Sequence, residues 1–222
     1  MSNQDSSNTT KKSTVYVALI TALAIIIGSV ILGLGGQTTP QEPTPEAAPA
    51  VELPNAGITE SNKASITFST NQGEIVIETT PSLAPLTVNA IAALAQKNYF
   101  DNTICHRLTT EGIFVLQCGD PTGTGTGGPG FNIPDENLPQ PIDNNYPAGT
   151  VAMANAGPGT SGSQFFLVYQ DTTLGPDYTI WGSITSGLDI LQTIASAGVV
   201  DGGADGAPLT GVTIESTKVT IS

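Results

Sequence analysis

Residues 104–120 read Ile-Cys-His-Arg-Leu-Thr-Thr-Glu-Gly-Ile-Phe-Val-Leu-Gln-Cys-Gly-Asp. The residues from Ile104 to Leu108 and from Ile113 to Gln117 predict two short strands, joined by a Thr-Glu-Gly turn. The first strand contains Arg107, the only arginine of the chain, directly after His106, the only histidine. This stretch therefore combines a predicted β-hairpin with the chain's only guanidinium and imidazole groups.

The sequence around Arg107 is acidic. Residues 64–222 contain 14 Asp and Glu against three basic residues, which are Lys97, Arg107 and Lys218. An arginine in such a chain most often pairs with an acid at the surface, where the pair contributes little to stability. The alternative is a functional role, because a guanidinium offers five donors and a charge that does not titrate. The motifs around Arg107, described below, favour the functional role.

The composition bounds the class of protein. Hydrophobic residues make up 39% of the 222 residues and charged residues 11%, with 25 Gly and 16 Pro. These values favour a loop-rich β protein over a coiled coil or a helical bundle. The formal net charge of −13 excludes electrostatic binding to nucleic acid, which needs clustered Lys and Arg.

Residues 15–34 predict a membrane-spanning helix that is not cleaved from the protein. The run has 20 residues without a charge, and a helix of that length spans roughly 30 Å. Lys11 and Lys12 precede it and no basic residue follows before Lys63, so the positive-inside rule places residues 1–14 in the cytoplasm and the rest outside. A cleaved signal peptide is the alternative, but its apolar core would be about 7–15 residues long and would end in a cleavage site that is missing here.

Two further regions follow the predicted anchor. Residues 35–63 contain five prolines and no apolar periodicity, which predicts a linker. Residues 64–222 predict a folded domain, which starts with a hairpin around Asn71-Gln72-Gly73. Two helices are expected, one from Pro85 with apolar residues at helical spacing and one at 188–195. Further strands are expected at 150–154, 164–169, 178–184 and 213–221, so the pattern predicts a closed antiparallel barrel.

The sequence contains few residues that could bind a cofactor or a metal ion. The glycine-rich stretch Gly123–Gly128 is followed by Pro129 and Pro134, which the helix of a dinucleotide-binding motif does not tolerate. The acidic turn Asp201–Gly206 lacks the distal glutamate of a calcium loop, since Val212 stands there. One histidine and two cysteines are too few for a zinc site. We therefore expect no cofactor and no metal.

Two motifs resemble those of the cyclophilin family of peptidyl-prolyl isomerases. The first is His106-Arg107, followed by Phe114-Val115-Leu116-Gln117-Cys118-Gly119-Asp120 and Gly125-Thr126-Gly127-Gly128. The second is Met153-Ala154-Asn155-Ala156-Gly157-Pro158, followed by Gly162-Ser163-Gln164-Phe165-Phe166. The resemblance covers residues 64–222 and, with the predicted anchor, indicates a bacterial, membrane-anchored form.

The resemblance implies a fold and a set of site residues. The fold would be a closed eight-stranded antiparallel β-barrel capped by two α-helices, with a groove for X-Pro peptides. Arg107 would be the catalytic residue. The proline pocket would be walled by Phe114, Val115, Phe166 and Leu174, with Tyr178 where the family often has a histidine. The polar and backbone contacts would come from Gln117, Gly125, Ala154, Asn155, Ala156 and Gln164. Each apolar residue of this set could instead belong to the barrel core.

The implied reaction suits a chain with few reactive groups. Rotation about a peptide bond meets a barrier of about 18–20 kcal/mol from amide resonance, and no bond breaks. A donor aimed at the prolyl nitrogen stabilises its lone pair as conjugation is lost, and Arg107 can donate without a pH-dependent switch.

We therefore expect a monomeric isomerase domain that assists the folding of proline-containing polypeptides outside the cytoplasmic membrane. The alternatives are a non-catalytic module that only binds proline-containing segments and a purely structural domain of the cell surface.

Cys105 and Cys118 are the only cysteines. If the two strands around them form a hairpin, these residues can form a disulfide, and two buried free thiols are the alternative.

Overall fold

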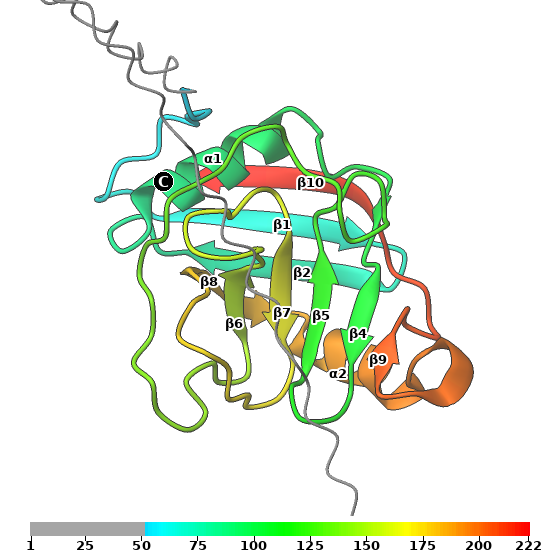
Figure 1. Cartoon of the computed structure of the whole chain (residues 1–222). Coiled ribbons are helices and arrows are strands. Elements are labelled where there is room, and N and C mark those ends of the chain that lie inside the picture. Colours follow the sequence, from blue (N-terminus) through cyan, green and yellow to red (C-terminus); the bar gives the residue numbers. More distant parts are fainter. Residues whose placement is uncertain (1–51) are drawn as a thin grey trace, which may run out of the picture. The chain divides into compact units, whose positions relative to one another are not determined.

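The alternating residues of the first predicted hairpin form two strands. β1 (Ala64–Thr70) and β2 (Gly73–Thr79) pair antiparallel, with Phe68 opposite Ile75. Every second residue of β1 is buried, so one face of the hairpin packs into the core. The computed structural model describes residues 52–222 (Figure 1).

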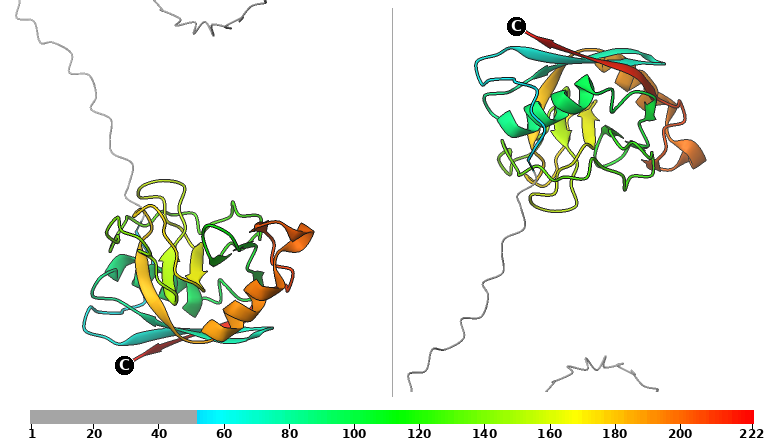
Figure 2. Two further views of the ribbon diagram at one scale, coloured as in Figure 1. Left: turned by 90° about the horizontal axis from the view of Figure 1, so that it is seen from below. Right: turned by 90° about the horizontal axis from the view of Figure 1, so that it is seen from above.

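Ten strands form one antiparallel sheet that curls around the core (Figures 1 and 2). Besides β1 and β2, the strands are β3 (Thr103–Ile104), β4 (Arg107–Thr109), β5 (Val115–Cys118), β6 (Thr150–Met153), β7 (Phe165–Val168), β8 (Ile180–Ser186), β9 (Asp205–Gly206) and β10 (Thr213–Ile221). Their order in the sheet is β3-β10-β1-β2-β8-β6-β7-β5-β4-β9. The expected mainly-β fold with two α-helices is therefore present.

The expected closed barrel of eight strands was wrong in two respects: the sheet of residues 52–222 has ten strands, and its end strands β3 and β9 do not pair with each other. Eight strands have three or more residues, and β3 and β9 add two residues each at the two ends of the strand order. β3 runs into β4 through Cys105 and His106, so the chain itself joins the two sides of the sheet there. Both short strands pair with distant partners, β10 and β4. A two-residue segment carries no alternating pattern that could predict such pairing.

Two helices accompany the sheet. α1 (Pro85–Gln96) begins with the proline at its first position and packs beside β10. A residue far away in the sequence caps its first turn. The carboxylate of Glu136 accepts hydrogen bonds from the backbone N–H groups of Leu86 and Thr87 at 3.0 and 2.8 Å. α2 (Leu188–Ala197) lies against β2, and a short 3₁₀ helix follows at Val200–Gly202.

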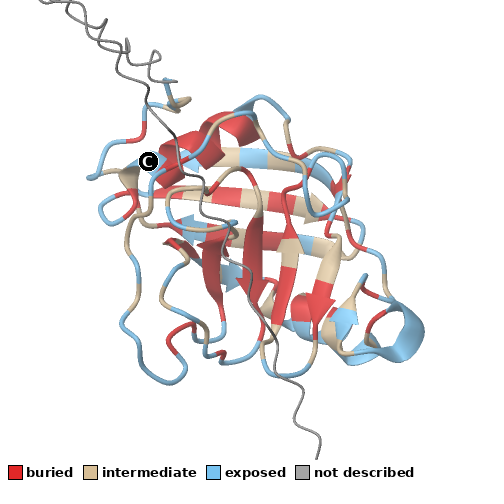
Figure 3. Ribbon diagram, in the orientation of Figure 1, coloured by how far each residue is buried: buried red, intermediate tan, exposed pale blue. Residues whose placement is uncertain are grey.

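The strands β5, β6 and β7 have apolar clusters on both faces, and Figure 3 shows them largely buried. Phe165 belongs to the main core, where its ring stacks on Phe68 at 5.2 Å between centroids. Phe166, the next residue, belongs to a smaller cluster on the opposite face, together with Val115 and Tyr146. We call this smaller group the second cluster. It forms because successive residues of a strand point to opposite faces.

Part of the predicted linker belongs to the folded unit. Leu53 and Ala56 pack against the main core, and Ile58 is buried. The backbone N–H of Ile58 donates to Asn89 Oδ1 at 2.9 Å, which ties this segment to α1. The predicted cytoplasmic tail, the predicted membrane helix at 15–34 and the start of the linker lie outside the described residues. Within residues 52–222, no helix has the length and apolar character needed to cross a membrane.

Candidate active site

Arg107 lies on β4 directly opposite Gln117 on β5. Its Nη1 donates a hydrogen bond to Gln117 Oε1 at 3.3 Å. The antiparallel pairing of the two strands therefore brings together two side chains that the sequence separates by ten positions.

The other edge of the Arg107 guanidinium is held by Asp205. Nε and Nη2 of Arg107 donate to the two carboxylate oxygens at 2.8 and 2.7 Å. The hydrogen bond with Asp205 raises the pKa of Arg107, and it lowers the pKa of Asp205. Both groups are therefore charged at neutral pH. The exposed ion pair that the acidic composition suggested does form, within the same site as the predicted groove residues.

A line of hydrogen bonds leads from Arg107 to the glycine-rich loop. Gln117 Nε2 donates to Gln164 Oε1 at 2.8 Å. Gln164 Nε2 donates in turn to the backbone carbonyls of Gly125 and Gly127 at 3.0 and 2.9 Å. The guanidinium, both glutamines and the loop thus form one connected polar network.

The buried carboxylate of Asp120 organises the glycine-rich loop. Its Oδ2 accepts hydrogen bonds from the backbone N–H groups of Gly125 and Gly127 at 2.6 and 3.1 Å, and its Oδ1 accepts two from Thr122. Burial alone would raise the pKa of Asp120, but the hydrogen bonds from Thr122, Gly127 and Gly125 lower this pKa to about 2. The ionised carboxylate of Asp120 therefore accepts hydrogen bonds from backbone N–H groups of the loop, which have no partner in a strand or a helix.

A surface groove of about 820 Å³ lies along this loop. Six of the predicted contact residues line it, and these are Gln117, Gly125, Ala154, Asn155, Ala156 and Gln164. The side chain of Asn155 is engaged elsewhere, because Nδ2 donates to the carbonyl of Asp177 at 2.8 Å and Oδ1 accepts from the N–H of Gly157 at 3.1 Å. The backbone of Asn155 is therefore the part that can contact a ligand.

Four of the predicted apolar residues gather in the second cluster. Val115 and Phe166 are buried in it, and Leu174 and Tyr178 pack against it with partial exposure. The rings of Phe166 and Tyr178 meet edge to face at 5.5 Å between centroids. Gln117 pairs directly with Phe166 across β5 and β7, so the polar network and the second cluster adjoin.

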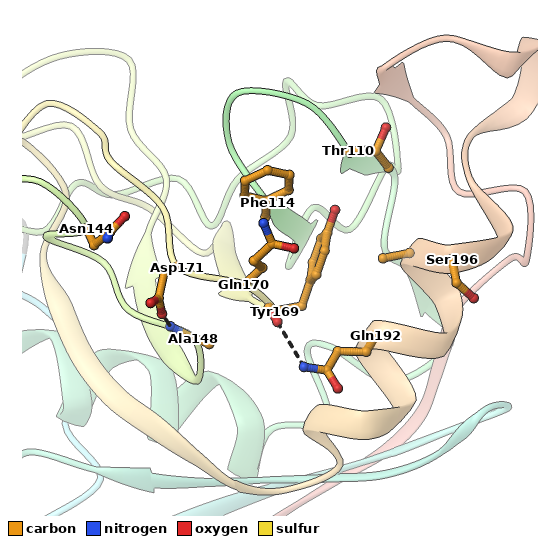
Figure 4. A pocket seen from close by; sticks show the side chains of 10 residues that line it. Thr110, Phe114, Asn144, Ala148, Tyr169, Gln170, Asp171, Gln192 and Ser196 are labelled. Atoms are coloured by element: carbon orange, nitrogen blue, oxygen red, sulfur yellow. Dashed lines mark hydrogen bonds between the residues drawn. The ribbon is translucent and has the colours of Figure 1, made fainter.

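Phe114 does not join this group. Figure 4 shows it lining another cavity, of about 840 Å³, near the end of β7 and α2. There its ring lies 6.0 Å from that of Tyr169. Phe114 and Val115 are neighbours in an extended segment, so their side chains point to opposite sides, and only that of Val115 reaches the second cluster.

Residues 65–219 match the family model described as cyclophilin type peptidyl-prolyl cis-trans isomerase/CLD. The chain belongs to the cyclophilin family. Two curated relatives share its sequence closely. The probable peptidyl-prolyl cis-trans isomerase B of Mycobacterium tuberculosis is 47% identical over 190 residues, which cover 78% of this chain and 61% of the relative. The protein of the same description in Mycobacterium leprae is 45% identical over 203 residues, covering 85% and 68%. The matched region thus spans about three fifths of the length of the M. tuberculosis relative.

Solved cyclophilins share the fold. The crystal structure of a cyclophilin type peptidyl-prolyl cis-trans isomerase from Cryptosporidium parvum is 30% identical, with a TM-score of 0.62, over 71% of this chain and 98% of that one. A second crystal structure of that protein was determined in the presence of the dipeptide Ala-Pro, and it matches with a TM-score of 0.61.

Three residues of this cyclophilin site had no predicted role in the sequence. Asp120 was part of the quoted motif, and its place before a glycine-rich stretch was the available signal. Asp205 lies in the acidic turn before the last strand, 98 positions from Arg107, and no local pattern connects the two. Tyr146 is fully buried, and its hydroxyl donates to the carbonyls of Gly175 and Tyr178 at 3.1 and 3.2 Å. Burial raises the pKa of Tyr146 to about 12, so the hydroxyl stays protonated.

Cys105 and Cys118 are joined in a disulfide. Cys105 lies two residues before Arg107, and Cys118 directly follows Gln117. The disulfide therefore braces the two segments that carry the start of the polar network.

Proposed function

We propose that this cyclophilin is a peptidyl-prolyl cis-trans isomerase in which Arg107 is the catalytic residue. The observation that carries the proposal is the position of the guanidinium. Through Gln117 it belongs to the network that runs along the groove, and Gln117 in turn pairs with Phe166 of the second cluster. A proline ring seated against that cluster would place its nitrogen beside the only arginine of the chain.

The free donors of Arg107 fit the reaction. A guanidinium has five N–H groups, and Arg107 uses one on each of Nε, Nη1 and Nη2 for Gln117 and Asp205. One N–H on each terminal nitrogen therefore remains for a ligand. Donation to the prolyl nitrogen stabilises its lone pair in the twisted state, where amide resonance is lost, and this lowers the barrier to rotation.

The groove would hold the two sides of the rotating bond differently. Val115, Phe166, Leu174 and Tyr178 form the proposed wall for the proline ring. The backbone of Asn155, with Ala154, Ala156, Gln164 and Gly125 along the groove, would hold the residues before the proline. Fixing one side while the other turns converts binding into stabilisation of the twisted state. No proton transfer or metal ion takes part in this scheme.

The test is catalysed cis-to-trans exchange of a proline-containing peptide, measured with the purified full chain. Arg107→Ala should lower kcat/KM by about 10²–10³, the usual effect of removing a donor that acts in the transition state. Lys97→Ala, at the end of α1, removes one positive charge outside the groove and serves as the matched control. An Arg107→Ala protein as active as the control would refute the assigned role.

We further propose that the domain acts outside the cytoplasmic membrane, where it assists the folding of proline-containing polypeptides. The charge-free run at 15–34 with Lys11 and Lys12 before it supports this location, and so does the disulfide, because disulfides persist in oxidising compartments. Protease added to intact cells should degrade the domain from outside. Protection from protease in intact cells, with degradation after lysis, would contradict the location without touching the isomerase proposal.

A further inference from the structure

Asp205 reaches Arg107 because of strand pairing. β9 pairs antiparallel with β4, with Thr109 opposite Asp205 and Leu108 opposite Gly206 (Figure 1). Arg107 and Thr109 lie on the same face of β4, so Asp205 is the diagonal neighbour of Arg107 on that face. The register of β9 therefore sets the position of the carboxylate.

The segment that carries Asp205 is itself held in place. On one side, the N–H of Thr110 donates to the carbonyl of Ala204 at 2.8 Å. On the other, the N–H of Val200 donates to the carbonyl of Ala207 at 2.8 Å, and Val199 forms a bridge with Pro208. The turn between these contacts is thus anchored to β4 and closed on itself, which makes Asp205 a preset partner rather than a mobile surface acid.

The two partners of Arg107 bind different edges of its planar guanidinium group. Asp205 binds the edge formed by Nε and Nη2, and Gln117 accepts from Nη1. A carboxylate matches that edge with two parallel hydrogen bonds, which restricts rotation of the guanidinium as well as its distance. A neutral or monodentate partner would leave more of that rotation free.

The ion pair itself is not well suited to stabilise the fold. The side chains of Arg107 and Asp205 are 39% and 54% exposed, and exposed pairs contribute little to stability. Its definite consequence is the orientation of the only arginine. We propose that Asp205 is a positioning residue, which holds the Arg107 guanidinium so that its remaining N–H groups face the prolyl nitrogen. This inference rests on the proposed catalytic role of Arg107.

The test compares Asp205→Asn and Asp205→Ala with a matched control in the full chain. Asp201→Asn removes one negative charge from an exposed position of the same turn and leaves the ion pair intact. With a proline-containing peptide, both Asp205 variants should lower kcat about 10- to 100-fold with little change in KM, because orientation is lost while the groove is kept. The control should match the wild-type protein, and thermal unfolding should be alike in all four proteins.

A second readout is independent of activity. Because the chain has one arginine, labelling with ¹⁵N-arginine gives a single Nε–H signal in an NMR spectrum, and it belongs to Arg107. The order parameter of this N–H should be high in the wild-type and Asp201→Asn proteins, and it should fall below about 0.6 in Asp205→Asn.

The outcomes separate this inference from the proposed function. If Arg107→Ala is inactive while both Asp205 variants keep wild-type kcat, Asp205 has no positioning role and only this inference fails. A higher kcat in the Asp205 variants overturns it as well, because the carboxylate would then compete with the substrate. If Arg107→Ala keeps full activity, the proposed function of Arg107 fails first.

Discussion

Gln164 determines which end of Gln117 faces Arg107. Gln164 Nε2 donates to two backbone carbonyls, so only its Oε1 is left to accept from Gln117 Nε2. The Oε1 of Gln117 must then point at the guanidinium, which can only donate. The loop carbonyls and the guanidinium therefore fix the orientation of both amides. Along the network, each amide presents its nitrogen toward the loop and its oxygen toward Arg107.

One substitution should break this network at the glycine-rich loop. Gln164→Glu removes the two hydrogen bonds to the carbonyls of Gly125 and Gly127 and places a carboxylate against these oxygens, which repels this wall of the groove. The amide of Gln117 keeps its oxygen toward Arg107, because a guanidinium can only donate. We expect kcat/KM for a proline peptide to fall about tenfold or more, which corresponds to roughly 1.4 kcal/mol. Gln170→Glu makes the same chemical change at an exposed position and should have no effect. Equal activities of the two variants would show that the hydrogen bonds from Gln164 to the loop are unimportant for catalysis.

Asp120 should make the domain sensitive to acid. Its pKa is lowered from the usual 3.8 to about 2, so its contribution to stability is complete above pH 3.8 and is lost as the pH falls through about 2. That shift corresponds to about 2–3 kcal/mol for this buried group. Asp120→Asn should therefore lower the free energy of unfolding by about this amount at pH 7, and the difference from wild type should shrink between pH 3.8 and 2. Asp143→Asn, an exposed acid, is the control, and a difference independent of pH would contradict the assignment.

Phe166 and Phe114 should respond differently to the same substitution. Phe166→Leu opens the proposed proline wall and should raise KM for a proline peptide several-fold, whereas Phe114→Leu lies at the other cavity and should leave KM unchanged. Each change should cost less than about 1.5 kcal/mol of stability, since the leucine keeps most of the apolar volume. Peptide titration with both variants measures this, and an equal effect on KM would place Phe114 at the pocket after all.

The disulfide should contribute measurably to stability. It closes a loop with a sequence separation of 13 residues, for which the chain-entropy account predicts about 3 kcal/mol. Reductant should therefore lower the unfolding midpoint of the wild-type protein. It should leave a Cys105→Ala/Cys118→Ala double variant unchanged, and this variant should already unfold at the lower midpoint. Reductant without effect on the wild-type midpoint would argue against a stabilising bond.

The sequence was most informative where a repeating pattern extends over many residues. The hairpin of β1 and β2, the helix from Pro85 and the last strand all follow from periodicity. In β1 the alternation also gives the buried face, whereas α1 is buried continuously from Thr87 to Ala95, which its apolar spacing did not indicate. The groove residues followed from the family motifs, and the structure brings six of them to one surface.

What the sequence could not supply depends on contacts between distant segments. β9 has two residues, and its pairing with β4 gives Arg107 a partner that no motif indicated. The sequence alone also offers an exposed ion pair and a catalytic role as alternatives for Arg107. The two are compatible, because Asp205 binds only one edge of the guanidinium. Phe114 shows a related limit, because a motif assigns adjacent residues to one pocket while strand geometry sends them to opposite sides.

The glycine-rich loop that Asp120 holds bears on which peptides the proposed isomerase would accept. Four glycines, at positions 125, 127, 128 and 130, line this side of the groove, so much of it offers peptide groups in place of side chains. Asp120 and Gln164 hold the N–H and carbonyl groups of this loop. In the proposed isomerase, such a surface would contact the main chain of a bound peptide more than its side chains. We therefore expect the proposed isomerase to accept many different residues around the proline.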